Sequence, residues 1–191
     1  MRLSISRAFL LGVLVALLAA PAHAATKRDV AIATSAGTIV VRLEPNRAPG
    51  TTANFLHYVD THAYDGASFY RVVNRANEPS APFEVIQGGI NPHGPSLAQP
   101  IPLEPTTSTK LHNDDGTIAM ARTSDPNSAT TEFFIDIGNA RYLDAGGPLG
   151  PGYAAFGRVV RGMDVVRRIF RSPSQGEALT PAVTIVRMRR V

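Results

Sequence analysis

The 191-residue chain contains no cysteine. This absence excludes disulfide bonds, thiolate nucleophiles and thiolate metal ligands together. It also excludes a lipoprotein, because there is no cysteine to carry the lipid. The absence of cysteine is compatible with export from the cell but does not establish it.

The chain also has no apolar run long enough to span a bilayer as a helix. Its longest run, residues 8–20, has 13 residues, whereas a membrane-spanning helix needs about 20. Arg2 and Arg7 precede the run, and Ala22-His23-Ala24 follows it as a small-x-small cleavage pattern. We therefore predict a cleaved secretory signal over residues 1–24, a periplasmic location and a mature domain over residues 25–191. An uncleaved anchor is the alternative; after cleavage, no stable membrane association is expected.

No part of the sequence concentrates charge of one sign. The net charge is +4, and two of the positive charges belong to the predicted signal. The remaining arginines are scattered, with mild clusters near residues 161–171 and 187–190. A nucleic-acid-binding protein usually carries a more focused basic patch, so we expect no nucleic-acid partner.

Motifs for nucleophilic, metal or phosphate chemistry are missing as well. No G-x-S-x-G occurs, and no glycine-rich phosphate loop joins a strand to a helix. His57 and His62 are five residues apart and do not share a helix face, while His93 and His112 lie in predicted loops. Asp114-Asp115 precedes a glycine and is typical of a turn. We therefore expect neither a metal nor a cofactor.

The chain does contain many short β-rich runs joined by turns. Helical spacing and Pro49 predict a helix over residues 48–60, and a second amphipathic pattern predicts a helix over residues 161–171. About eight strands are expected, within residues 29–44 (two strands), 67–73, 83–87, 117–122, 131–138, 154–160 and 182–190. This pattern favours a mainly β fold, a closed eight-stranded antiparallel barrel capped by two α-helices. Closure would also remove exposed strand edges.

Alternation along two strands predicts a shared outer face. In "TEFFIDIG", one set of side chains faces the core and the other set faces outward; the core set is Phe133, Ile135 and Ile137, and the outward set is Glu132, Phe134 and Asp136. In "FEVIQ", Phe83, Val85 and Gln87 share one face. The alternative is a surface with scattered apolar side chains, which is ordinary in proteins.

Arg71 and Gln87 are the polar residues that stand out in this context. Arg71 interrupts the apolar run "SFYRVV", and Gln87 ends "EVIQ" before two glycines. One interpretation is a surface arginine followed by a turn. The other is a polar pair beside an apolar pocket.

Three blocks of the sequence together resemble the signature blocks of the cyclophilins. They are "SFYRVV" with "VIQGG", "GTIAMARTSDPNSATTEFFI", and "YLD" with "GYAAFGRVVRGMDVV". Together with "TSAGTIVVRLEPNRAPGTTANFLHYV", the resemblance covers nearly the whole mature chain, and it looks most like exported bacterial members. Cyclophilins are peptidyl-prolyl cis-trans isomerases built on an eight-stranded barrel with two helices, so the resemblance implies that activity and that fold.

The resemblance also implies roles for particular residues. Arg71 takes the place of the catalytic arginine and Gln87 that of the neighbouring glutamine. Tyr142 stands where animal members carry a tryptophan that helps to bind cyclosporin, which implies weak affinity for that drug. The substrate-binding positions, comprising the proline pocket and the peptide-backbone edge, are Phe83, Val85, Ala121, Arg122, Glu132, Phe134, Tyr142, Leu143 and Tyr153.

Three departures from the family pattern affect the expected pocket. Arg71 and Gln87 are sixteen residues apart, about twice the usual spacing, which implies an inserted loop near residues 74–82. Glu84 stands where a pocket phenylalanine is usual, so either Phe83 fills the pocket or the pocket is more polar. Glu132 replaces a glutamine, and we expect its carboxylate to pair with Arg71 and to weaken the activity. Tyr70 replaces a histidine that is peripheral to the expected chemistry.

The residue types suit rotation about an imide bond. Amide resonance gives a barrier of roughly 18–20 kcal/mol, and cis and trans X–Pro differ by only about 0.5–1 kcal/mol. A fixed guanidinium can donate to the imide nitrogen only once resonance is lost, which stabilises the transition state selectively. Gln87 can hold Arg71 or bind the substrate carbonyl. The expected partners are proline-containing peptides and unfolded exported proteins, bound by a monomer. The alternatives are a weakly active binding module and a structural role for the inserted loop.

Overall fold

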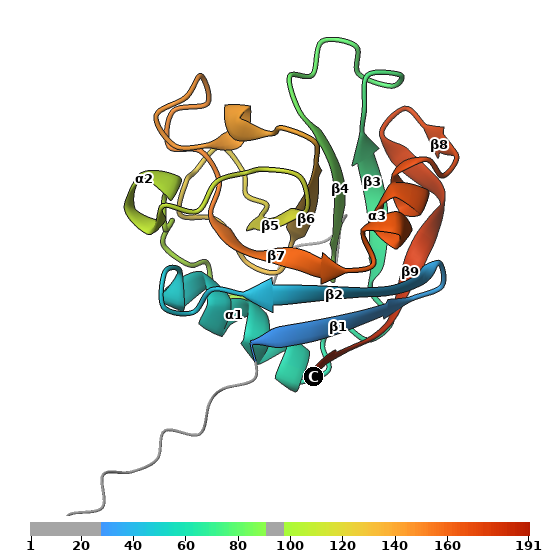
Figure 1. Cartoon of the computed structure of the whole chain (residues 1–191), viewed down its shortest axis with the longest axis horizontal. Coiled ribbons are helices and arrows are strands. Elements are labelled where there is room, and N and C mark those ends of the chain that lie inside the picture. The colour runs from blue at the N-terminus through green and yellow to red at the C-terminus, as the bar shows by residue number, and fades with distance from the viewer. Residues whose placement is uncertain (1–27, 91–97) are drawn as a thin grey trace, which may run out of the picture.

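The computed structural model describes residues 28–90 and 98–191 (Figure 1). The predicted signal, residues 1–24, and His93 lie outside the described residues. Nine strands are found within these ranges: β1 Asp29–Thr34, β2 Gly37–Leu43, β3 Ser68–Val73, β4 Glu84–Gly89, β5 Thr117–Met120, β6 Phe133–Ile137, β7 Ala155–Arg161, β8 Ser174–Gln175 and β9 Ala178–Arg190.

Eight of these strands close into a barrel. The order is β1-β2-β7-β5-β6-β4-β3-β9, and a further pairing between β1 and β9 closes the ring. Each of the paired strands runs antiparallel to its neighbour. The two-residue β8 pairs with β9 and lies beside the ring. The predicted closed eight-stranded antiparallel barrel is therefore confirmed.

Two of the three α-helices in the described ranges are those that the sequence predicts. Helix α1, Pro49–Asp60, begins with proline in its first turn, where its missing N–H costs nothing. Helix α3 spans Met163–Phe170. The third helix, α2, is the single turn Thr106–Thr109, in a segment to which the sequence assigns no helix or strand. Threonine is a weak helix former, and a four-residue turn is too short to show a helical repeat. The sequence therefore does not predict this turn.

The barrel core contains a cluster of aromatic rings around Phe55 of α1. Its ring centroid lies 5.3 Å from that of Tyr64, 5.6 Å from Phe133 and 5.2 Å from Phe156. All four side chains are buried, and each such burial contributes about 1.5–3 kcal/mol. Helix α3 adds Val165, Val166 and Ile169 to the same core. Both longer helices therefore pack against the barrel through their apolar faces.

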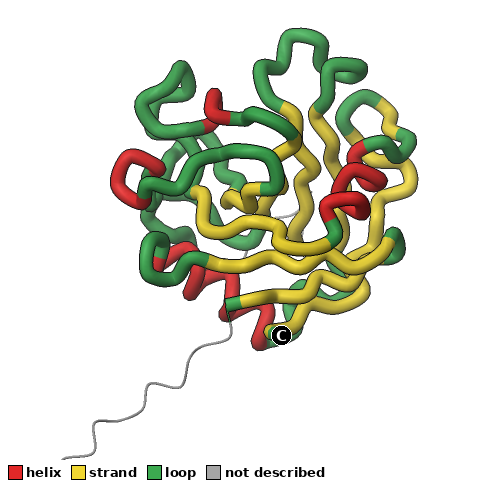
Figure 2. The backbone as a smooth tube through the Cα atoms, viewed as in Figure 1, coloured by secondary structure: helices red, strands yellow, loops and turns green. Residues whose placement is uncertain are grey.

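A second apolar cluster lies on the other face of the barrel wall. Its buried members are Val73, Val85, Ala119, Phe134, Ala140 and Leu143. They come from β3, β4, β5 and β6 and from the loop that follows β6. The long loops gather on one side of the barrel (Figure 2). The predicted shared outer face of residues 83–87 and 131–138 is confirmed.

The burial of Asp136 is not predicted by the sequence. It shares the face of Phe134 as expected, but the residue is fully buried, whereas the sequence predicts only that it faces outward from the barrel core. Neither carboxyl oxygen has a hydrogen-bond partner within residues 28–90 and 98–191. Strand alternation gives the face of a residue but not the loop that covers it, which explains why the burial is not predicted.

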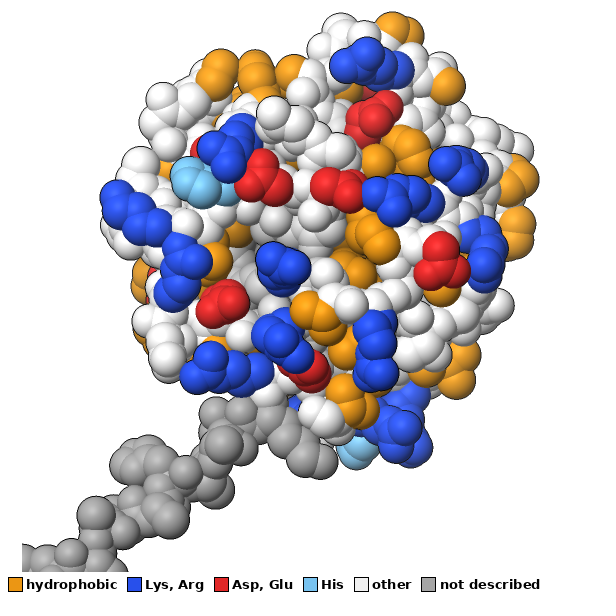
Figure 3. Space-filling view, in the orientation of Figure 1, with side chains coloured by type: hydrophobic (Ala, Val, Ile, Leu, Met, Phe, Trp, Pro, Cys, Tyr) orange, Lys and Arg blue, Asp and Glu red, His pale blue; other side chains and the backbone are white. Residues whose placement is uncertain are grey.

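Charged side chains are dispersed over the face shown in Figure 3, where arginine and lysine alternate with acidic residues. Many cations are paired, for example Arg42 with Asp29 at 2.8 Å and Arg167 with Asp115 at 2.7 Å. Among the described residues, no helix has both the length and the apolar character needed to cross a membrane.

Candidate active site

A β-bulge in β3 sets the direction of Arg71. The register shifts between Phe69 and Arg71 in the pairings with both β4 and β9. Tyr70 is the extra residue, and an extra residue shifts the inward and outward alternation of a strand by one place. As a result, Phe69 and Val72 both lie in the barrel core. Arg71 instead faces the second cluster, opposite Gln87 of β4.

Glycines at the end of β4 make room for this arrangement. A Cβ atom on Gly88 would lie 2.8 Å from the Ser68 carbonyl oxygen and 2.9 Å from Cδ1 of Phe69. A Cβ atom on Gly89 would lie 2.2 Å from the Glu132 carboxyl carbon. At Gly88 the contact with backbone leaves no room for a side chain beside the bulge, whereas at Gly89 a side chain would displace the Glu132 carboxylate from its position.

The Arg71 guanidinium is held by two hydrogen bonds. Its Nη1 donates to Oε1 of Gln87 at 2.7 Å. Its Nε donates to Oε2 of Glu177 at 2.8 Å, which forms an ion pair. These bonds hold the guanidinium beside the second cluster.

The polar network continues from Gln87 to Glu132. Nε2 of Gln87 donates to the Tyr70 hydroxyl at 2.8 Å, and that hydroxyl donates to Oε2 of Glu132 at 2.6 Å. The predicted ion pair between Glu132 and Arg71 is wrong. In the described part of the chain, the carboxylate paired with Arg71 is that of Glu177, because Tyr70 and Gln87 lie between Glu132 and the guanidinium.

Tyr70 is therefore more central than the sequence suggested. Burial raises the pKa of its hydroxyl, and the hydrogen bond to Glu132 raises the pKa further. The hydroxyl stays protonated over the physiological range, so it can donate to Glu132 and accept from Gln87 at the same time.

A cavity of about 180 Å³ lies beside Arg71. It is lined by Arg71, Phe83, Val85, Gln87, Ala121, Arg122, Phe134, Leu143 and Tyr153. Nine of the eleven sequence-predicted site residues are thus brought together. The other two lie near this group: Tyr142 stacks against Phe83, with ring centroids 6.5 Å apart, and Glu132 contacts Tyr70.

Aromatic contacts shape the wall of the cavity. The rings of Phe134 and Tyr153 meet edge to face, with centroids 5.5 Å apart. The Arg122 guanidinium lies 4.5 Å from the centroid of the Tyr153 ring, a cation–π arrangement. Nε of Arg122 also donates to the Gly152 carbonyl at 2.9 Å. Arg122 therefore fixes the loop that carries Tyr153.

Phe83 occupies the cavity wall, and Glu84 does not line it. Glu84 begins β4, and its carboxylate accepts a hydrogen bond from the Arg75 N–H at 3.3 Å. Of the two alternatives left open by the sequence, the apolar wall is the one present.

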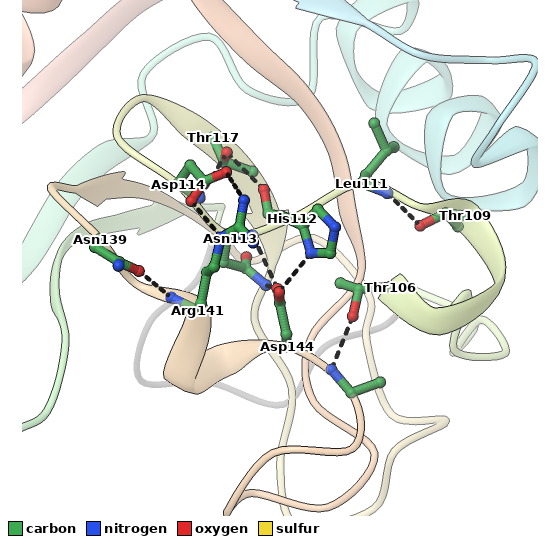
Figure 4. Close-up of polar contacts among 11 residues, drawn as sticks. Thr106, Thr109, Leu111, His112, Asn113, Asp114, Thr117, Asn139, Arg141 and Asp144 are labelled. Carbon is green, nitrogen blue, oxygen red and sulfur yellow. Dashed lines mark hydrogen bonds and ion pairs between the residues drawn. The ribbon is translucent and has the colours of Figure 1, made fainter.

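Asp144 holds the 3-10 turn η1, Arg141–Leu143, that brings Leu143 to the cavity. Its Oδ1 accepts hydrogen bonds from the backbone and side-chain amides of Asn113, both at 2.9 Å. Its Oδ2 lies 2.7 Å from Nδ1 of His112. Figure 4 shows these contacts converging on Asp144. His112 thus has a structural partner, which is consistent with its predicted loop position.

Glu177 is the contact that sequence reasoning missed. It lies between β8 and β9 and is separated from Arg71 by 106 residues. The surrounding "SPSQGEAL" carries no motif, and the sequence predicts neither a helix nor a strand there. Pairing of β3 with β9 brings it close, because Arg71 lies opposite Ala178.

No group of three or more metal-ligating side chains is found in the ranges that the structure describes. The site therefore consists of a hydrogen-bonded cation, an amide and a cavity with both apolar and polar side chains in its wall.

Comparison with known families agrees with this geometry. The model of the family described as "Cyclophilin type peptidyl-prolyl cis-trans isomerase/CLD" matches residues 29–190. The chain belongs to the cyclophilin-type peptidyl-prolyl cis-trans isomerases. These are isomerases, and the resemblance seen in the sequence blocks is confirmed.

Bacterial cyclophilins are among the similar proteins. A peptidyl-prolyl cis-trans isomerase of Acinetobacter baylyi is 38% identical over 153 residues, covering 80% of this chain and 77% of the relative. One from Streptomyces antibioticus is 42% identical over 142 residues, covering 73% and 81%. Peptidyl-prolyl cis-trans isomerase B of Escherichia coli is 38% identical over 138 residues, covering 71% and 80%.

Solved cyclophilin structures share the fold. A Cryptosporidium parvum cyclophilin, crystallised in the presence of the dipeptide Ala-Pro, superposes with a TM-score of 0.70 at 22% identity, over 85% of this chain and 98% of that one. A cyclophilin from Hirschia baltica gives a TM-score of 0.67 at 22% identity, over 86% and 74%.

Proposed function

We propose that Arg71 is the catalytic cation of this isomerase and that Gln87 holds it. The observation that carries this proposal is the position of the anchored Arg71 guanidinium in the wall of a cavity that also offers aromatic and aliphatic side chains. When the imide bond twists, its nitrogen regains a lone pair that can accept a hydrogen bond from Arg71. The planar imide nitrogen offers no such acceptor, so the bond favours the transition state.

The cavity wall would bind the proline ring. Phe83, Val85, Phe134, Leu143 and Tyr153 offer apolar or aromatic surface to it. The bound proline ring would stay fixed while the preceding carbonyl rotates. Binding would then leave the torsion angle of the imide bond as the main freedom of the substrate. Ala121 and Arg122 also line the cavity, and the family resemblance implies that they bind the substrate backbone. The Gln87 side-chain oxygen accepts from Arg71, and its NH₂ group, the only part that could donate to a substrate carbonyl, already donates to the Tyr70 hydroxyl. Both contacts favour the holding role.

The test is the isomerisation rate of an Xaa-Pro peptide. We expect the protein to accelerate the reaction, and Arg71→Ala to lower kcat/KM by about 10²–10³-fold, as for the loss of other transition-state donors. Arg71→Lys keeps the charge but loses the planar fork, so we expect it to restore little. Unchanged activity in Arg71→Ala would contradict the role of Arg71. Peptide binding without any acceleration would favour the weakly active binding module.

The cellular role that we propose is assistance to the folding of exported proteins by a monomer in the periplasm. It rests on the predicted signal over residues 1–24, and the absence of cysteine is compatible with it. Unfolded exported chains would supply X–Pro bonds, whose uncatalysed isomerisation takes tens to hundreds of seconds. Cell fractionation tests the location, and refolding of an exported protein with a native cis-proline tests the role. Retention of the protein in the cytoplasm would contradict the location.

A further inference from the structure

Arg71 is fixed from two directions by groups on different strands. Gln87 of β4 accepts from Nη1, and Glu177, beside β9, accepts from Nε. Within the described residues, Nη2 makes no hydrogen bond to a protein atom. The two anchors together define the plane of the guanidinium. With only one of the two hydrogen bonds, the guanidinium could still rotate about that bond.

Glu177 is itself held beside Arg71 by its backbone. Its carbonyl oxygen accepts a hydrogen bond from the Val72 N–H at 2.8 Å, one residue beyond Arg71. Its side chain is 36% exposed, and that of Arg71 is 38% exposed. The ion pair is accessible enough for substrate to approach. The hydrogen bond from the Val72 N–H to the Glu177 carbonyl sets the distance between β3 and the segment that carries Glu177.

The inserted loop contacts the turn that carries Glu177. Nδ2 of Asn77 donates to the carbonyl oxygen of Val72 at 2.9 Å and to that of Gly176 at 3.1 Å. Its Oδ1 accepts from the Asn74 N–H at 2.9 Å, which keeps the loop folded on itself. Asn77 therefore connects the end of β3, the inserted loop and the residue that precedes Glu177.

We propose that Glu177 is a positioning residue for Arg71 and that the insertion, through Asn77, holds Glu177 in place. This inference rests on the proposed role of Arg71. Glu177 fixes the Nε side of the guanidinium, so that Nη2 is directed to the substrate. The insertion therefore supports the position of Glu177 through the hydrogen bonds of Asn77 to Val72 and Gly176.

Two substitutions at Glu177 separate anchoring from charge. Glu177→Ala removes the acceptor, and we expect kcat/KM to fall on the order of tenfold, mostly through kcat. Glu177→Gln keeps an oxygen that can accept from Nε, so we expect activity within about threefold of the unmodified protein. The control is Asp29→Ala, which breaks the ion pair with Arg42, also 2.8 Å long and outside the site; its activity should not change.

A spectroscopic measurement tests positioning directly. The Arg71 Nε–H signal should exchange slowly with water in the unmodified protein, faster in Glu177→Ala and slowly again in Glu177→Gln. Equal losses of activity in both variants, or higher activity in Glu177→Ala, would overturn the positioning role. If Arg71→Ala destroys activity while Glu177→Ala does not, this proposal fails and the role of Arg71 stands. If Arg71→Ala is fully active, the role of Arg71 fails.

Asn77→Asp tests the contribution of the insertion. It keeps Oδ1 for the Asn74 N–H but removes the donor to Val72 and Gly176. We expect a loss of several-fold in kcat/KM, and no further loss when it is combined with Glu177→Ala, because both act on one group. Glu78→Ala, in the same loop, is the control and should retain activity. Fully additive losses would overturn the link between the insertion and Glu177.

Discussion

The orientation of one amide group, that of Gln87, follows from its two neighbours. Arg71 can only donate, so Gln87 must present its oxygen there. The Gln87 NH₂ group then faces Tyr70, whose hydroxyl accepts because its own proton goes to Glu132. Glu132 therefore acts on Arg71 through two intervening groups, and its charge is not in contact with the guanidinium.

This chain of hydrogen bonds predicts a mild phenotype for Glu132→Gln. The amide oxygen can still accept from Tyr70, so we expect kcat/KM to stay within about threefold of the unmodified protein. Glu132→Ala removes that acceptor and should cost more than Glu132→Gln. Peptide isomerisation assays on both variants check the order. A tenfold gain in Glu132→Gln would mean that the carboxylate weakens Arg71 by its charge, and a tenfold loss would mean that the charge itself is needed.

At the scale of elements, the bulge in β3 decides which face Arg71 occupies. Regular alternation in "SFYRVV" would place Arg71 on the same side as Phe69, in the barrel core. The extra residue Tyr70 moves it to the opposite side. Gly88 is the counterpart on β4, because its missing Cβ leaves room for the Ser68 carbonyl and the Phe69 ring.

Gly88→Ala should therefore disturb both stability and catalysis. The added methyl group would meet the backbone at 2.8 Å and the Phe69 ring at 2.9 Å, and such overpacking costs about 1–3 kcal/mol. We expect a lower Tm in thermal unfolding and a lower kcat/KM, since Gln87 adjoins the strained position. Gly50→Ala is the matched control: its nearest neighbour is the flexible Glu104 side chain at 3.4 Å. A Gly88→Ala protein with unchanged Tm would contradict this account.

The elements that the sequence predicts well are those with a repeating pattern. Alternation located the strand around Phe133, and helical spacing around Phe55 located α1. The bulge at Tyr70 and the contact between Glu177 and Arg71 could not be predicted, because they depend on how β3 pairs with β4 and β9. The family resemblance supplied Arg71 and Gln87, but it could not place the residues between them, because their spacing of sixteen departs from the usual family pattern.

At the scale of the whole molecule, the barrel wall separates two apolar clusters, and Asp136 is buried in that wall. Asp136 lies opposite Val85 of the second cluster and is fully buried. Burial raises the pKa of Asp136 well above its ordinary value of 3.8, and the charges of Asp144, Asp114 and Asp115 raise the pKa further. Folding is therefore coupled to the protonation of Asp136.

The sign of this coupling follows from the raised pKa. The folded chain binds the Asp136 proton more tightly than the unfolded chain, so stability falls as the pH rises from the unfolded-state pKa through the folded-state pKa. Asp29 and Asp60 act in the opposite direction, because hydrogen bonds from Arg42 and Arg190 lower the pKa of these two groups. A comparison of two variants at each pH cancels these other contributions.

The stability of Asp136→Asn relative to the unmodified protein should increase as the pH rises. Asparagine has nearly the same shape and no titrating proton, so it avoids the cost of a buried carboxylate. We expect its Tm relative to the unmodified protein to increase between about pH 4 and about pH 8. Asp164→Asn, at an exposed position on α3, is the control and should show no such trend. A Tm difference for Asp136→Asn that is constant over this range, or that falls with pH, would mean that Asp136 does not take up its proton on folding.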